Sequence, residues 1–195
     1  MATVRAFVAI ELPAPVKEAL REVQDSLKKE GDGQVRWVGM ESIHLTLKFL
    51  GNVPTEKVEA IAQAVKGACR GVRPFSLELK DTGVFPGVQR PRVVWVGVGG
   101  EEGILALLQG RVEANLAALG FPREGRPFTA HLTLGRVRED ATPAARRRLG
   151  EGVAAAQLPR PTLWRVTEAT LMRSQLTPSG AIYTPLAVAP LLEGE

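Results

Sequence analysis

Each of the two histidines of this chain, His44 and His131, begins a copy of the same four-residue sequence, His-Leu-Thr-Leu. The two copies are 87 positions apart. An imidazole titrates near neutral pH, so one ring can accept a proton while another donates one. Each such transfer typically accelerates a reaction by about 10²–10⁴. Two histidines placed in the same sequence setting therefore indicate paired general acid–base catalysis.

The repeated segment also predicts which side chains share a face. Successive side chains of a β-strand point to opposite faces, so His44 lies beside Thr46 and His131 beside Thr133, while the leucines face the other way. A threonine hydroxyl can donate a hydrogen bond to an anionic phosphoryl oxygen, which contributes about 1.5–3 kcal/mol. A phosphodiester held between the two pairs would use all four groups.

Other chemistries explain the duplication less well. Two histidines without a nearby cysteine or a closely spaced His/Glu partner supply too few ligands for a metal, and a serine triad needs only one histidine. We therefore expect no metal and no cofactor. The one cysteine, Cys69, excludes an intramolecular disulfide and falls on the apolar stripe of a predicted helix, so we expect it to be buried filler.

Further residues could line the same groove. Arg126, five positions before His131, is a candidate phosphate ligand or a solvent-exposed loop residue. Lys48 continues the face of His44 and either lines the groove or caps its rim. Phe49 falls on the leucine face and is expected in the core, whereas Arg136 has the opposite parity from His131 and is expected to make a structural pairing.

The charge of the chain favours an anionic partner. The formal net charge is +4 and the isoelectric point is near 9.6, which places nucleic acid first among the candidates. The densest basic cluster, Arg146 to Arg148, is expected to be a solvated helix face rather than a phosphate site. Trp37 and Tyr183 could stack on bases, although packing is the favoured role for each.

The elements that must position these residues follow from periodicity and turn residues. A shift of 87 residues places segment 7–12 on 94–99, one histidine segment on the other, and Thr55 on Thr142, each an expected helix start. Strands are expected at 5–12, 34–38, 42–50, 74–85, 92–98, 128–137, 162–176 and 181–189, and helices around 16–27, 58–65, 104–116 and after 143.

This pattern predicts an α+β fold with two pseudo-symmetric lobes. Each lobe should be an antiparallel-rich sheet with helices on its outer face, and a central groove should carry the two His-x-Thr-x motifs. No long linker separates the copies, so residues 1–195 should form one bilobal domain. The start of the chain lacks the pattern of a secretory signal and no apolar run is long enough to span a membrane, which favours a cytoplasmic protein.

Four segments carry a family resemblance: FVAIELP, RWV with ESIHLTLKFLG, RPFTAHLTLGR and LMRSQLTPSGAIYTPL. From about residue 5 to 186 the chain resembles the two-histidine (2H) phosphoesterases. Within them it is similar to the RNA 2′,3′-cyclic phosphodiesterases, also called bacterial and archaeal 2′-5′ RNA ligases. One departure is Ala130, where that family often has proline.

The resemblance implies hydrolysis of RNA 2′,3′-cyclic phosphate ends to 2′-phosphates without metal, and 2′-5′ ligation in the reverse direction. It implies that His44 donates a proton to the 3′ oxygen, that His131 activates water, and that Thr46 and Thr133 hold the phosphate. The expected partners are RNA ends, such as tRNA halves or small oligonucleotides, bound by a monomer.

Two alternatives stay open at the level of sequence. The four groups recognise a phosphate rather than a base, so the chain could instead act on other cyclic or 2′-5′-linked nucleotides. It could also be a non-catalytic module that binds an RNA end, although binding alone gives no reason to use two titrating histidines.

Overall fold

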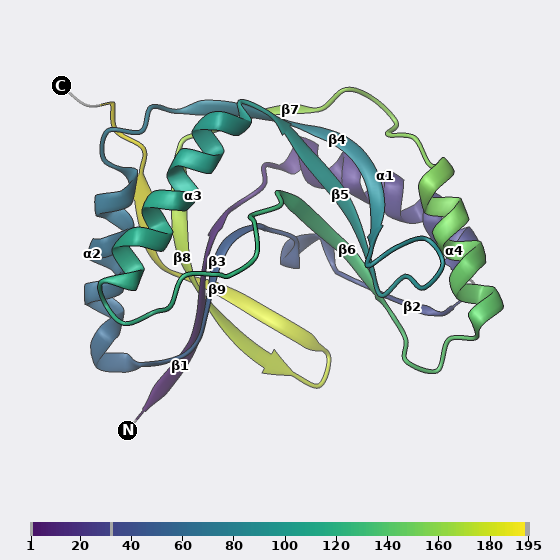
Figure 1. Ribbon diagram of the computed structural model, residues 1–195, viewed down its shortest axis with the longest axis horizontal. Coiled ribbons are helices and arrows are strands. Elements are labelled where there is room, and N and C mark those ends of the chain that lie inside the picture. Colours follow the sequence, from purple (N-terminus) through teal and green to yellow (C-terminus); the bar gives the residue numbers. More distant parts are fainter. Residues whose placement is uncertain (1, 32, 194–195) are drawn as a thin grey trace.

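The computed structural model describes residues 2–31 and 33–193, which contain two antiparallel sheets and four α-helices (Figure 1). Short 3₁₀ turns at Met40–Ser42 and Thr55–Lys57 precede strand β3 (Leu45–Pro54) and helix α2 (Val58–Cys69). The strands and helices in chain order are β1 Thr3–Ile10, α1 Ala14–Gly31, β2 Val35–Trp37, β3 Leu45–Pro54, α2 Val58–Cys69, β4 Phe75–Phe85, β5 Val93–Gly100, α3 Glu102–Ala117, β6 His131–Val137, α4 Pro143–Ala155, β7 Leu163–Val166, β8 Glu168–Thr177 and β9 Gly180–Pro190.

The two sheets repeat one arrangement. The four-stranded sheet has the order β3-β1-β8-β9, and four strands of the other, β6-β5-β4-β7, repeat it, with β2 added beside β6. Helices α2 and α3 pack together over the first sheet, and α1 and α4 lie together over the second (Figure 1). Each half of the chain therefore gives one helix to each lobe, and the expected two-lobed α+β fold is confirmed.

Most of the buried apolar residues form one core that continues through both lobes. It includes Val8 and Leu45 in the first sheet and Val96 and Leu132 in the second, all fully buried. This continuity supports the expectation of one bilobal domain, which stays a prediction. None of the described helices combines the length and hydropathy needed to cross a membrane.

Two local expectations differ from the structure. Segment 162–176 is not one strand, because β7 pairs with β4 in one sheet and β8 pairs with β1 and β9 in the other. Thr55 does not cap α2, because its hydroxyl donates to the carbonyl of Ala2 (3.1 Å). The equivalent residue, Thr142, does cap α4, where its side-chain oxygen accepts from the backbone N–H of Ala145 (3.2 Å).

Two residues outside the groove have structural roles. Cys69 is buried as expected, and burial raises the pKa of its thiol to about 11. Arg146 is not simply solvated, because its guanidinium donates to the carbonyls of Pro91, Arg138 and Glu139 at 2.8–3.1 Å. It therefore holds the loop after β6 against the start of α4.

Candidate active site

A β-bulge follows each His-x-Thr pair at the same point of the repeat. Along β1 and β3, Val8 is opposite Lys48 and Ala9 is opposite Thr46, so Leu47 is an extra residue. Along β5 and β6 the residue skipped in the same way is Leu134, 87 positions later. A bulge reverses the alternation of the residues beyond it, so these side chains change face.

The bulges overturn two expectations from strand parity. Phe49 is not in the core but 71% exposed, and it lies over Phe7 on the groove face with ring centroids 6.0 Å apart. Arg136, at the equivalent place in β6, is exposed and reaches the groove instead of making only a structural pairing. Gly135 stands at the second bulge, and a glycine inside a strand was the signal that could have revealed it.

His44 lies just before β3, half-buried between two aromatic rings. Its imidazole meets Tyr183 edge-on at 5.1 Å and Phe7 at 5.8 Å between centroids. Phe7 belongs to a small apolar cluster on the groove face of the first sheet, and Tyr183 packs against it. Nδ1 of His44 is 3.2 Å from the carbonyl oxygen of Ser42. A carbonyl only accepts, so Nδ1 carries the hydrogen and Nε2 is left to exchange a proton.

His131 has the same hydrogen-bond arrangement at the start of β6. Its Nδ1 is 2.7 Å from the carbonyl oxygen of Thr129, again two residues earlier in the chain, and its ring meets Phe85 edge-on at 5.2 Å. Both rings are therefore oriented by the backbone, and both have Nε2 available for a ligand.

Residues of both halves line two adjoining cavities. Both histidines line the larger one, of about 590 Å³. The smaller cavity, of about 270 Å³, extends toward β8 and β9. Five residues line both: His44, Thr46, Phe49, Thr133 and Arg136.

Of the other residues that the sequence suggested for the groove, the two threonines, Arg126 and Tyr183 line a cavity and Trp37 does not. Within the described residues neither Thr46 nor Thr133 has a hydrogen-bond partner for its hydroxyl, so both can donate to a ligand. Arg126 is exposed and lines the larger cavity, and Tyr183 lines the smaller one. Trp37 packs against the core and lines neither cavity.

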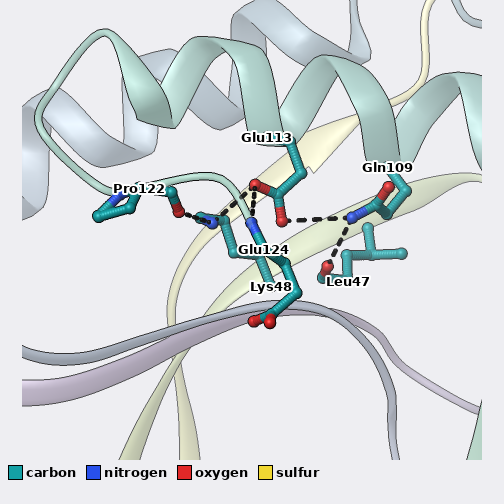
Figure 2. Close-up of polar contacts among 6 residues, drawn as sticks. All are labelled: Leu47, Lys48, Gln109, Glu113, Pro122 and Glu124. Carbon is teal, nitrogen blue, oxygen red and sulfur yellow. Dashed lines mark hydrogen bonds and ion pairs between the residues drawn. The ribbon is translucent and has the colours of Figure 1, made fainter. Parts of the chain in front are cut away.

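Lys48 is part of a buried polar network at the wall of the larger cavity (Figure 2). Its Nζ donates to Glu113 Oε2 on α3 and to the carbonyl of Pro122, each at 2.8 Å. The backbone N–H of Glu124 donates to the same carboxylate oxygen (3.3 Å). Gln109 Nε2 lies 3.4 Å from the other carboxylate oxygen and 3.4 Å from the carbonyl of Leu47, the bulge residue. The network therefore ties β3 to α3 and to the loop that carries Arg126.

No group of three or more His, Cys, Asp or Glu side chains among the described residues is placed to hold a metal ion. The polar side chains shared by the two cavities are instead an imidazole, two hydroxyls and a guanidinium, and His131 adds a second imidazole in the larger cavity. Such groups suit an anion that bears exchangeable protons or accepts hydrogen bonds.

The pKa of the His44 imidazole should be lower than that of an exposed histidine. Burial lowers the pKa of this imidazole; the hydrogen bond to Ser42 opposes the shift, the charge of Lys17 adds to it, and Glu41 opposes it. The folded ring should therefore stay neutral at a pH where an exposed histidine, with a pKa near 6.5, is already protonated. Histidine NMR can measure this directly, because the chain has only two imidazoles.

In such a titration a His131→Gln variant assigns the two signals. The His44 resonance should titrate below about 6.5 without anions and move upward when inorganic phosphate is added, because a nearby negative charge favours the imidazolium. A His44 signal that titrates at or above the ordinary value in anion-free buffer would contradict the burial argument.

Known proteins that resemble this chain show which class of protein it belongs to. Residues 10–95 and 98–183 each match the family described as LigT like Phosphoesterase. An RNA 2′,3′-cyclic phosphodiesterase of Methanothermobacter thermautotrophicus is 38% identical over 185 residues, covering 95% of this chain and 97% of that protein. A protein of the same name from Archaeoglobus fulgidus is 34% identical, with 94% and 98% covered.

Solved structures show the same architecture. Protein TT0787 of Thermus thermophilus superposes with a TM-score of 0.77 at 30% identity, covering 98% of this chain and 99% of that one. Escherichia coli LigT in complex with 3′-AMP superposes with a TM-score of 0.75 at 31% identity, covering 97% and 99%. Fold and site together define a phosphoesterase made of two repeated halves.

The two family matches meet within β5, so each matched half carries one histidine motif. The chain belongs to the LigT-like phosphoesterase family, the two-histidine phosphoesterases.

Proposed function

We propose that this phosphoesterase hydrolyses RNA 2′,3′-cyclic phosphate ends to 2′-phosphates by paired-histidine acid–base catalysis. The observation that carries the proposal is that both His-x-Thr pairs line one cavity, with each Nδ1 tied to a backbone carbonyl. The names of the full-length relatives supply the substrate class.

In the proposed hydrolysis His131 acts as the base and His44 as the acid. Nε2 of His131 takes a proton from water as the water oxygen bonds to phosphorus. The bond between phosphorus and the 3′ oxygen breaks, and Nε2 of protonated His44 gives its proton to that oxygen. The hydroxyls of Thr46 and Thr133 donate to the non-bridging oxygens, and the guanidiniums of Arg136 and Arg126 offset the phosphate charge. The product is a 2′-phosphate beside a free 3′-hydroxyl.

The lowered pKa of His44 is compatible with the role of acid. A weaker base is a stronger acid once it is protonated, and the phosphate anion favours the imidazolium when substrate binds. The assignment of acid and base rests on the family resemblance, because the two halves are too alike to distinguish the roles.

The two-sided groove supports reversible 2′-5′ ligation as part of the proposal. The shared residues have the larger cavity on one side and the smaller cavity on the other, so a phosphate among them has room for a group on each side. In ligation a 5′-hydroxyl would take the place of water. RNA ends such as tRNA halves, a monomeric state and a cytoplasmic location belong to the same proposal.

The test is incubation of a 2′,3′-cyclic-phosphate oligonucleotide with the protein in excess chelator. We expect full turnover in chelator and a 2′-phosphate product identified by ³¹P NMR. A small cyclic mononucleotide in a parallel reaction separates RNA ends from free cyclic nucleotides as the preferred substrate.

Two results would count against the proposal. Activity that appears only with added metal, or a 3′-phosphate product, would require a different mechanism. Tight binding of the RNA end without product after long incubation would favour a non-catalytic binding module.

A further inference from the structure

Two arginines stand directly opposite each other beside the groove. In the β2–β6 ladder Arg36 pairs with Arg136. Directly opposed residues of an antiparallel pair project from the same face, with Cβ atoms about 4.5–5.5 Å apart. Arg136 lines both cavities, so Arg36 lies on the groove face immediately outside it.

The packing on the other face of β2 gives the same orientation independently. A Cβ on Gly135 would lie 2.6 Å from Val35 Cγ1 and 3.0 Å from Trp37 Cε3, so both side chains cover this glycine on the core side. Val35 is buried and Trp37 packs against the core. Arg36, between them in sequence, must point to the opposite face, and it is exposed there.

The described part of the chain offers this arginine pair no compensating charge. Among the described residues neither Arg36 nor Arg136 makes an ion pair or a side-chain hydrogen bond. Like charges directly opposite each other destabilise a sheet, so the arrangement is unfavourable for folding alone. A polyanion would remove the cost, and guanidinium groups hold phosphate oxygens in pairs.

We propose that Arg36 binds the phosphodiester next to the reacting phosphate, one nucleotide back along the RNA. The inference rests on the proposed function, in which Arg136 holds the terminal phosphate. Neighbouring strands are about 4.8 Å apart, so two long side chains on β6 and β2 can hold successive phosphates of one backbone. The groove thus continues across the edge strand β2, and the site distinguishes an RNA chain from a free cyclic mononucleotide.

The test compares Arg36→Gln with wild type on two substrates, a cyclic-ended oligonucleotide and a 2′,3′-cyclic mononucleotide. We expect kcat/KM for the oligonucleotide to fall about fivefold through KM, as for loss of one exposed ion pair, with no change for the mononucleotide. Arg36→Lys should recover part of the loss because it keeps the charge. Arg136→Gln should instead slow both substrates.

A binding experiment keeps this inference separate from the proposed function. In the His131→Ala background, anisotropy of a labelled cyclic-ended oligonucleotide measures affinity without turnover. Arg36→Gln should reduce the slope of log affinity against log salt by about 0.7, the value for one single-strand phosphate contact. Arg165→Gln is the matched control, because Arg165 is exposed on β7, the opposite edge strand of the same sheet, and lines neither cavity.

The outcomes are distinguishable. An unchanged salt slope and oligonucleotide KM in Arg36→Gln would overturn the inference, as would equal losses on both substrates. Absence of turnover in the wild type would overturn the proposed function, while a changed salt slope in the binding experiment would still support Arg36 as a backbone contact.

Discussion

Replacing His44 or His131 by alanine should lower kcat on a cyclic-ended RNA by about 10³-fold, in the middle of the range for loss of one proton transfer. Each imidazole is oriented through Nδ1, so a substitution removes a preset proton donor or acceptor rather than a flexible one. The double variant should lose far less than the product of the two single losses, because the pair acts as a unit.

A substrate with a good leaving group separates the two roles. A phosphodiester that releases p-nitrophenolate needs no proton on the departing oxygen. His44→Ala should therefore recover most of its activity on this substrate, whereas His131→Ala should not, because water must still be activated. The reverse result would exchange the acid and base assignments.

A loss of activity assigns a role to either histidine only if the alanine variant remains folded. His44 is half-buried between Phe7 and Tyr183, so thermal unfolding and binding of inorganic phosphate should be measured beside activity. A folded variant that keeps a near-normal rate on the cyclic-ended RNA would remove that histidine from the mechanism.

The largest expected effect on stability is that of Lys48→Met. The side chains of Lys48 and Glu113 are only 5% and 9% exposed, and removing one partner of a buried ion pair typically costs about 3–5 kcal/mol. The carboxylate would keep its bonds to Gln109 and Glu124 but lose its counter-charge, and Pro122 would lose its donor. The unfolding midpoint should fall by roughly 6–20 °C for a chain of this size.

A double-mutant cycle tests the cause of that loss. Lys48→Met combined with Glu113→Leu should recover much of the stability, because well-packed apolar residues can replace a buried pair at little cost. Lys17→Met is the matched control, since its ion pair with Glu41 has the same 2.8 Å length but is exposed, and its midpoint should hardly move. Equal losses for Lys17→Met and Lys48→Met would contradict the role given to burial.

The Lys48→Met variant should also show a change in enzyme kinetics. The network joins β3 to the loop after α3, which carries Arg126 and leads into His131. In the folded Lys48→Met protein at low temperature we expect a higher KM with a smaller change in kcat, because the wall of the larger cavity loses its anchor.

Much of the site was predictable because it is encoded by local periodicity. The shared face of His44 and Thr46, and of His131 and Thr133, follows from the two-residue period of a strand. The offset of 87 residues placed both motifs in equivalent strands, and the structure brings them to one cavity. The two-lobed α+β fold followed from the same repeat together with the apolar stripes of the helices.

The errors arose where long-range contacts override local pattern. Phe49 and Arg136 changed face because an extra residue is accommodated at Leu47 and Leu134, and a bulge depends on the partner strand. Thr55 had the residue type of a helix cap but found the carbonyl of Ala2 instead.

The sequence by itself therefore determined which groups are candidates for the chemistry and which strands position them, because those properties depend on residue type and on the two-residue period of a strand. Only the tertiary structure decided that Lys48 is buried against Glu113, that Arg136 enters the groove, and that Arg36 stands beside it. These placements depend on strand register and on contacts between residues far apart in the chain, which no local pattern specifies.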